Sequence, residues 1–182
     1  MFSDWPRIAR RIRVPLGFAF AFMYVWLARP TCSSIVIGTI IAIPGLWLRG
    51  LAAGHVRKDT ELTTGGPYAY TRNPLYLGTL ILAAGFAAAA RSWVVAGIMV
   101  VIFLGIYVPV IWSEEAFLRE NFREFSEYSA RVPRLLPRLP AVRTDRGTFS
   151  WELYRKHREY NAILGTAAMV AILIAKLFWI SA

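Results

Sequence analysis

The residue types best suited to chemistry gather in one short segment, Leu62–Gly78, which reads Leu-Thr-Thr-Gly-Gly-Pro-Tyr-Ala-Tyr-Thr-Arg-Asn-Pro-Leu-Tyr-Leu-Gly. Gly65–Pro67 predicts a tight turn whose backbone groups are open to a ligand. Asn73 followed by Pro74 predicts a helix N-cap and a proline at the first helical position, and a helix N-terminus attracts carboxylates. A well-capped loop with interfacial tyrosines explains each residue alone. The combination of three tyrosines, an arginine and an asparagine within nine residues favours a ligand site.

Three further side chains can act on a ligand. A carboxylate at Glu114 or Glu115 can pair with a ligand ammonium, although acids at a helix start also favour the helix dipole without any ligand. His55 stands at the end of an apolar block beside basic residues and can be interpreted as a general base. An interfacial histidine without a special partner is the simpler interpretation, because a base needs the right geometry. His157 is expected to face solvent.

These motifs resemble the isoprenylcysteine carboxyl methyltransferase and phospholipid methyltransferase family of integral membrane enzymes. Gly66–Gly78 is similar to the family signature Gly-x-Tyr-x-x-x-Arg-(His or Asn)-Pro-x-Tyr-x-Gly. Upstream, Gly45–Gly54 resembles the family's preceding span with its Arg-bearing exit. Downstream, the acidic pair, Phe122–Tyr128 and Arg131–Pro137 resemble its later motifs. The resemblance covers about residues 38–140 and keeps the family's order.

The resemblance implies an S-adenosylmethionine-dependent methyltransferase that releases S-adenosylhomocysteine. Its acceptor would be lipophilic: the carboxylate or thiol of an isoprenoid-like compound, or the amine of a phospholipid. Glu114 would pair with the methionyl ammonium and the Asn73 region would hold the carboxylate, while tyrosines would pack on the sulfonium. Arg72, Asn73 and Tyr76 are candidates for positioning the reactants, and no catalytic group is assigned. The implied cofactor contacts are Glu61, Leu62, Thr63, Tyr68, Arg72, Asn73, Pro74, Tyr76, Glu114 and Glu115.

Two departures from the family pattern bear on the acceptor. Asn73 stands where many eukaryotic relatives have histidine, so hydrogen bonding is kept but a titrating imidazole is lost. Val110 stands where the isoprenylcysteine enzymes place an arginine that meets the substrate, one turn before the acidic pair. An isoprenylcysteine carboxylate therefore lacks its expected partner.

The elements that must position these residues are membrane helices. Of the 182 residues, 57% are hydrophobic and the mean hydropathy is +0.45, above the range of about 45–50% apolar for soluble proteins. All 11 Asp and Glu lie outside the long apolar blocks. The sequence predicts an all-α transmembrane bundle of about five spans, or four if the short first block does not cross. The predicted spans are Val14–Ala28, Ser33–Leu48, Pro74–Ala90, Ser92–Trp112 and Asn161–Ile180.

The distribution of Lys and Arg predicts the orientation. Residues 1–13 hold four, residues 49–73 four and residues 113–160 ten, whereas the two intervening turns hold one each. Because cytoplasmic segments carry the excess of basic residues, this predicts a cytoplasmic N-terminus and a cofactor pocket at the cytoplasmic face. Lys176, in the last span, is expected to snorkel to the outer surface; the alternative is a polar contact within the bundle.

Two elements are expected to complete the pocket after the fourth span. Glu114–Val132 has an apolar stripe and predicts an amphipathic helix lying on the membrane surface. Residues 132–140 predict an extended, Arg-bearing strap, because proline lacks an N–H and disfavours helix in the residue before it. The whole chain, 1–182, is interpreted as one domain, with its core at 38–140 and a last helix at 161–180.

Composition excludes several other functions. The net charge of +10 arises from basic residues at the ends of apolar blocks, which suits anionic lipid headgroups rather than nucleic acid. One cysteine, Cys32, excludes an internal disulfide, and no Cys/His spacing predicts a metal site. The expected partners are a lipophilic substrate and membrane lipids, with no obligatory protein partner evident. Two alternatives stay open: an NADPH-dependent sterol or prenyl reductase, and a non-enzymatic membrane protein.

Overall fold

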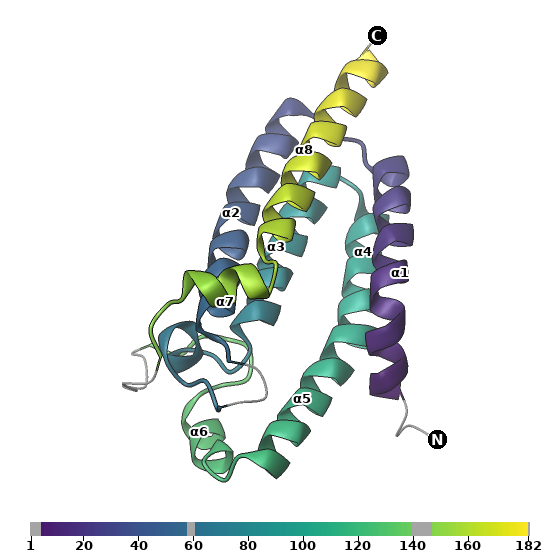
Figure 1. The fold of residues 1–182 in the computed structure, drawn as a ribbon. Helices are drawn as coiled ribbons and strands as arrows, with labels where there is room; N and C mark the ends of the chain where they lie inside the picture. Colours follow the sequence, from purple (N-terminus) through teal and green to yellow (C-terminus); the bar gives the residue numbers. More distant parts are fainter. Residues whose placement is uncertain (1–4, 58–60, 140–146, 182) are drawn as a thin grey trace.

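The computed structural model describes residues 5–57, 61–139 and 147–181, and its described regular elements are all helical. Figure 1 shows the long helices running side by side, with residues 61–73, 122–139 and 147–159 gathered toward one end, which we call the loop end. The helices are α1 Trp5–Leu27, α2 Cys32–His55, a 3₁₀ turn η1 Gly66–Ala69, α3 Pro74–Ala90, α4 Trp93–Ile102, a π-helical segment η2 Phe103–Tyr107, α5 Val108–Asn121, α6 Phe125–Arg131, α7 Trp151–Lys156 and α8 Tyr160–Ser181.

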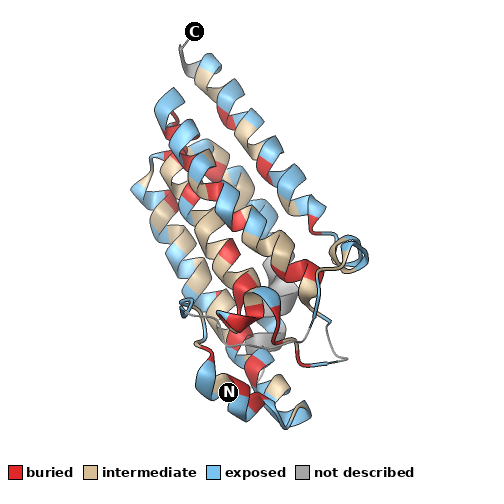
Figure 2. Ribbon diagram, turned by 90° about the vertical axis from the view of Figure 1, so that its left-hand side faces the viewer, coloured by how far each residue is buried: buried red, intermediate tan, exposed pale blue. Residues whose placement is uncertain are grey.

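The predicted class, a helical membrane bundle, is confirmed. Three helices are long and apolar enough to cross a bilayer, namely Cys32–His55, Trp93–Asn121 and Tyr160–Trp179. The apolar stretches Pro15–Leu27 and Pro74–Ala90 are shorter and run beside them. The outer faces of the long helices are exposed (Figure 2) and carry large apolar side chains, as lipid contact requires. Examples are Phe18, Phe22, Ile40, Trp47, Val101, Leu104 and Phe178.

Helices α2 and α3 pack most closely, because small residues face each other along their contact. A Cβ added to Gly38 would lie 2.5 Å from the carbonyl oxygen of Gly85, and one added to Gly45 would lie 2.7 Å from that of Gly78. Small residues let membrane helices approach backbone to backbone, where dispersion contacts replace the absent hydrophobic drive. This contact fixes α3, whose first turn carries the predicted signature.

The fourth span is one continuous helix, α4–η2–α5, with a widened turn in its middle. The Val108 N–H donates to the Phe103 carbonyl, a π-type bond, immediately before Pro109. A proline ring crowds the carbonyl four residues earlier, and the wider turn relieves this contact. The helix thus passes the predicted end at Trp112 and carries the acidic pair on its last turns.

The predicted amphipathic helix Glu114–Val132 is wrong as a single element. Helix α5 ends at Asn121, Phe122 is extended with φ −126° and ψ 110°, and the short α6 follows. Phe125 and Tyr128 pack with Leu62 in a buried cluster instead of lying on the membrane surface. Leu62, in the loop before α3, is the tertiary partner of the apolar stripe. The chain turns after Asn121 so that the stripe can pack on it.

Helix α8 is joined to α1 by Lys176. Its Nζ donates to the carbonyl oxygens of Val25, Trp26 and Ala28 at 2.6, 3.0 and 2.6 Å. The last carbonyls of a helix have no partner within the helix, so the ammonium satisfies the end of α1. The structure thus shows the polar contact within the bundle that was the alternative to snorkelling.

Candidate functional site

The loop before α3 and the strap after α6 form the floor of the candidate site. The Arg72 N–H donates to the Pro133 carbonyl at 2.9 Å, and the Arg138 N–H donates to the Tyr70 carbonyl at 2.9 Å. Between them the Thr71 hydroxyl, 1% exposed, bonds to the Leu135 carbonyl at 3.0 Å. Over its described residues 132–139, the strap is non-helical, as its prolines predict.

Glu115 is the centre of a buried charged cluster at this floor. It is 5% exposed and accepts from Asn73 Nδ2 at 3.0 Å and from Arg134 Nε at 3.0 Å. Asn73 binds Oε1, whereas Arg134 Nε binds Oε2, and Arg134 Nη2 and Arg72 Nη1 lie 2.9 and 3.5 Å from the same Oε2. The dipole interpretation of the acidic pair is wrong, because neither acid lies in the first turn of α5, which begins at Val108. Cationic and amide partners stabilise Glu115 there.

Glu114, the neighbouring acid, has a different environment. It is exposed and accepts a hydrogen bond from the Tyr76 hydroxyl at 2.9 Å. The Tyr76 ring stands edge-on to the Tyr107 ring, with centroids 6.0 Å apart. The signature at the start of α3 and the second acidic motif on α5 therefore meet in space, with a solvent-accessible carboxylate beside two aromatic rings.

Arg72 and Asn73 are largely committed to the floor. Asn73 occupies the N-cap position of α3, but its side chain makes no cap bond, and its amide also donates to the Arg134 carbonyl at 3.0 Å. The predicted N-cap position and the following proline are thus confirmed, but the Asn73 side chain donates to Glu115 and Arg134 and makes no cap bond. Arg72 is 12% exposed, and its buried Nε has no hydrogen-bond partner among the described residues. Pro74 opens α3 and is buried.

Tyr68 lies inside the site. It is 8% exposed, and its carbonyl accepts from the Tyr128 hydroxyl at 2.8 Å. Burial raises the pKa of the Tyr68 phenol far above its ordinary value, and the neighbouring Tyr128 and Glu114 raise it further. Tyr68 is therefore a neutral hydrogen-bonding group at any physiological pH.

The three remaining predicted contacts, Glu61, Leu62 and Thr63, lie in the segment between α2 and the glycine turn, which we call the loop entrance. Leu62 is buried against Phe125, within the cluster that turns the chain after α5. Glu61 is exposed and 3.5 Å from Arg57. The Thr63 hydroxyl accepts from the Arg57 N–H at 3.2 Å. Glu61 and Thr63 thus order this entrance, while the Leu62 side chain serves packing.

Both histidines are held by backbone carbonyls. His55 Nδ1 lies 2.8 Å from the Leu51 carbonyl, and its ring lies under Gly66, which adopts φ +57°. His55 therefore has a definite partner and supports the glycine turn, unlike the simpler interpretation, while its role as a general base stays a hypothesis. His157, expected to face solvent, places Nδ1 3.0 Å from the Ala53 carbonyl.

The sequence interpretation missed a second buried ion pair. Arg49 Nε donates to Glu159 at 2.6 Å, and its Nη1 donates to the Thr79 hydroxyl. The side chains of Arg49 and Glu159 are 23% and 10% exposed. Because Arg49 lies on α2, Thr79 on α3 and Glu159 just before α8, these contacts tie the start of α8 to α2 and α3. Glu159 directly precedes the last apolar block, and an acid so close to a membrane span could have indicated a buried ion pair. Arg134 was noted only as part of the strap.

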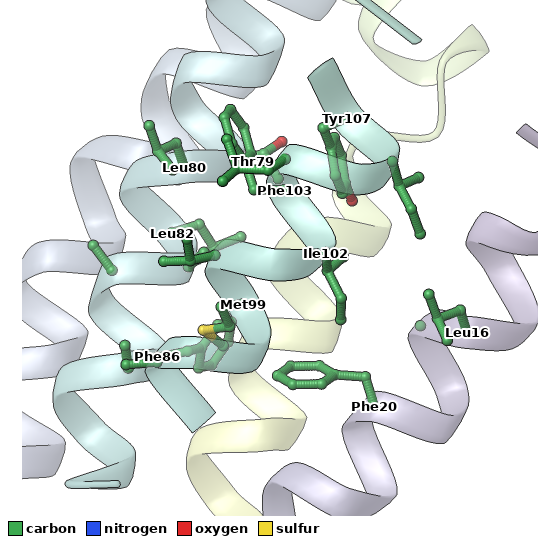
Figure 3. A pocket seen from close by; sticks show the side chains of 18 residues that line it. Leu16, Phe20, Thr79, Leu80, Leu82, Phe86, Met99, Ile102, Phe103 and Tyr107 are labelled. Carbon is green, nitrogen blue, oxygen red and sulfur yellow. The ribbon is translucent and has the colours of Figure 1, made fainter. Parts of the chain in front are cut away.

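An apolar cavity of about 430 Å³ opens between α1, α3 and the α4–η2 segment. Figure 3 shows Thr79, Phe103 and Tyr107 at one end and Phe20, Phe86 and Met99 at the other. Since Tyr107 also contacts Tyr76, the cavity adjoins the site. Val110 does not line it, but is 1% exposed in a core cluster against which Tyr76 packs.

A helical membrane bundle with this signature at its loop end defines a class of membrane-embedded transferases. The chain belongs to the phospholipid methyltransferase family, which it matches over residues 30–124, just over half of its length. This match and the distant similarity to an isoprenylcysteine methyltransferase given below confirm the family indicated by the sequence motifs.

Three relatives show how far this likeness extends. The chain is 36% identical over 121 residues to the nickel-cobalt-cadmium resistance protein NccN of Alcaligenes xylosoxydans xylosoxydans, covering 66% of this chain and 56% of that protein. It is 33% identical over 130 residues to the cobalt-zinc-cadmium resistance protein CzcN of Cupriavidus metallidurans, covering 71% and 58%. It is 24% identical over 144 residues to the protein-S-isoprenylcysteine O-methyltransferase of Schizosaccharomyces pombe, covering 76% and 61%.

The chain thus spans less than two thirds of each of these relatives. No solved structure matches it. Although two relatives are named for metal resistance, the described residues contain no group of three or more His, Cys, Asp or Glu side chains that could hold a metal ion.

Proposed function

We propose that the protein transfers a methyl group from S-adenosylmethionine to a lipophilic acceptor at the cytoplasmic face of a membrane. One observation carries the proposal: the exposed Glu114, hydrogen-bonded by Tyr76, stands beside an apolar cavity in a chain of a methyltransferase family. A cofactor reached from water and an acceptor reached from lipid can meet only where a polar site adjoins an apolar one.

The residues present fit the charged end of S-adenosylmethionine. Glu114 is accessible to pair with the methionyl ammonium, and Arg72, whose side chain is 12% exposed at the floor, is the candidate cation for the cofactor carboxylate. Tyr68 and Tyr76 offer aromatic faces and hydroxyls to the sulfonium. When bound, the cofactor supplies an electrophilic methyl group. Glu115 is better assigned to holding Arg72 and Asn73 in place than to touching the cofactor.

The protein's own contribution is alignment and exclusion of water. Methyl transfer from a sulfonium is an in-line displacement, so the rate depends on holding the acceptor opposite the methyl group. A carboxylate or thiolate acceptor needs no base. The cytoplasmic placement rests on the basic residues, because residues 113–160, which include the strap, carry ten of them.

Calorimetry on the detergent-solubilised chain tests the cofactor. We expect S-adenosylhomocysteine to bind and NADPH to show no heat of binding, since a reductase would need groups for several phosphates. Radiolabelled S-adenosylmethionine, incubated with the chain in membranes, should label the lipid extract. Binding of NADPH alone would favour the reductase, and binding of neither would favour a non-enzymatic membrane protein.

A further inference from the structure

The cavity between α1, α3 and the α4–η2 segment has the character of a binding site for one hydrocarbon chain. Among the residues that line it, only Thr79 and Tyr107 carry polar side-chain atoms, and both lie at the same end (Figure 3). All other walls are aliphatic, aromatic or glycine, and no charged group reaches them. A ligand here must be apolar along its length and can be polar only at that end.

The polar end of the cavity is the end nearest the candidate site. The ring of Tyr107 lines the cavity and contacts the ring of Tyr76, whose hydroxyl donates to Glu114. Thr79 reaches the same end and accepts from Arg49. A chain whose head lies beside these residues would present that head toward the carboxylate proposed to hold the cofactor.

Aromatic rings line the opposite end of the cavity. Phe20 and Phe86 both pack on Tyr24, with ring centroids 6.1 and 5.8 Å away. Tyr24 is 2% exposed, and its hydroxyl donates to the Phe86 carbonyl at 2.9 Å. Tyr24 therefore packs behind both rings, and moving it away from them would break this buried hydrogen bond.

The depth follows from helix geometry. Phe86 lies seven residues after Thr79 on α3, which at 1.5 Å per residue is about 10 Å. One leaflet of a bilayer has a hydrocarbon depth of about 15 Å. The cavity is therefore shorter than a full membrane acyl chain, and at about 430 Å³ it suits one chain rather than two.

We propose that this cavity holds a single hydrocarbon chain of the methyl acceptor, head toward Thr79 and Tyr107, chain end against Phe20, Phe86 and Met99. This assignment rests on the proposed methyl transfer. The acceptor class it selects is a single-chain amphiphile with a chain of limited length, rather than a lipid whose two chains must enter together.

Two glycines provide a matched pair of variants. Gly17 lines the cavity and Gly97 does not, and at both positions an added Cβ meets nothing within 4 Å. Gly17→Leu should therefore fill the cavity without disturbing the helices, whereas Gly97→Leu adds the same atoms outside it. Both variants should melt at the wild-type temperature or slightly above it, because replacing glycine in a helix is itself favourable.

The probes are octanoic, lauric and palmitic acids with a photoreactive diazirine at the terminal carbon. After irradiation, mass spectrometry should locate adducts of the shorter probes on Phe86 and Met99, and palmitic acid should label these residues least. Gly17→Leu should lower this labelling about tenfold, an affinity change of about 1.4 kcal/mol, while Gly97→Leu leaves it unchanged. Two results would overturn the proposal that the cavity binds a hydrocarbon chain. One is equal labelling of the lipid-facing Ile40, and the other is labelling of Phe86 and Met99 that survives Gly17→Leu.

A second readout separates this inference from the proposed function. S-adenosylhomocysteine affinity should be the same in the wild type, Gly17→Leu and Gly97→Leu, whereas methyl transfer into lipid should fall about tenfold only in Gly17→Leu. Wild-type protein that takes up the probe but binds no S-adenosylhomocysteine would defeat the methyltransferase proposal and with it the acceptor role. Normal cofactor binding with undiminished transfer in Gly17→Leu would defeat the chain site alone.

Discussion

Adjacent acids on α5 should respond in opposite ways to the same substitution, because one is buried in a charged cluster and the other faces the proposed cofactor. Glu115→Gln keeps the size of the side chain but removes the charge that Arg72 and Arg134 share. Breaking a buried ion pair on one side costs about 3–5 kcal/mol. Since Arg134 is 48% exposed and can be resolvated, we place the cost near the lower limit, at about 3 kcal/mol.

Glu114→Gln should leave the fold intact. Its carboxylate is exposed, and the Tyr76 hydroxyl can still donate to the amide oxygen. The loss should appear in S-adenosylhomocysteine binding, where a hydrogen bond to a charged group is worth about 1.5–3 kcal/mol, or about 10-fold to 150-fold in Kd. The control is Glu120→Gln, which makes the same change at an exposed acid of the same helix and should leave S-adenosylhomocysteine binding unchanged.

Thermal unfolding in detergent and calorimetric titration measure the two effects on the same samples. For a chain of this size, 1 kcal/mol corresponds to about 2–4 °C, so Glu115→Gln should lower Tm by about 6–12 °C and Glu114→Gln by less than about 2 °C. Equal losses of Tm in both variants would refute the division of roles between the acids. A change below about twofold in Kd for Glu114→Gln, less than 0.5 kcal/mol, would refute its contact with the cofactor.

The remaining predictions concern the supports of the site and are read from Tm in detergent. Gly66→Ala should destabilise the chain by about 1–2 kcal/mol because its backbone is left-handed, and further because the added Cβ would collide with the His55 ring. Adding His55→Ala removes the collision, so it should recover that further loss but not the backbone cost. Arg49→Gln and Glu159→Gln should each be strongly destabilising, and the double variant should lose at least about 1 kcal/mol less than the sum; strict additivity would show that the pair is not coupled. Lys176→Met should cost up to about 2 kcal/mol through the end of α1, and an unchanged Tm would show that its carbonyl contacts do not hold α8 in place.

The sequence by itself determined the membrane helices and the family. Apolar blocks free of acids specify membrane helices because an unpaired charge is costly in lipid, and the prolines of residues 133–137 exclude a helix whatever they contact. Gly66 and Pro67 specified the turn before α3 in the same local way. These are properties of a residue and its chain neighbours, so no knowledge of distant partners was needed.

Tertiary structure alone decided which side chains are free to meet a ligand. Glu114 and Glu115 are adjacent in the sequence, yet a helix turns successive side chains about 100° apart, so one faces the charged floor and the other the surface. Leu62 and Phe125 end the amphipathic helix early by packing on each other across sixty residues of chain. The cavity needs α1, α3 and α4 at once, and the end of α1 finds its cation on α8. Such contacts depend on the relative placement of whole helices, which local patterns of hydrophobicity and charge do not specify.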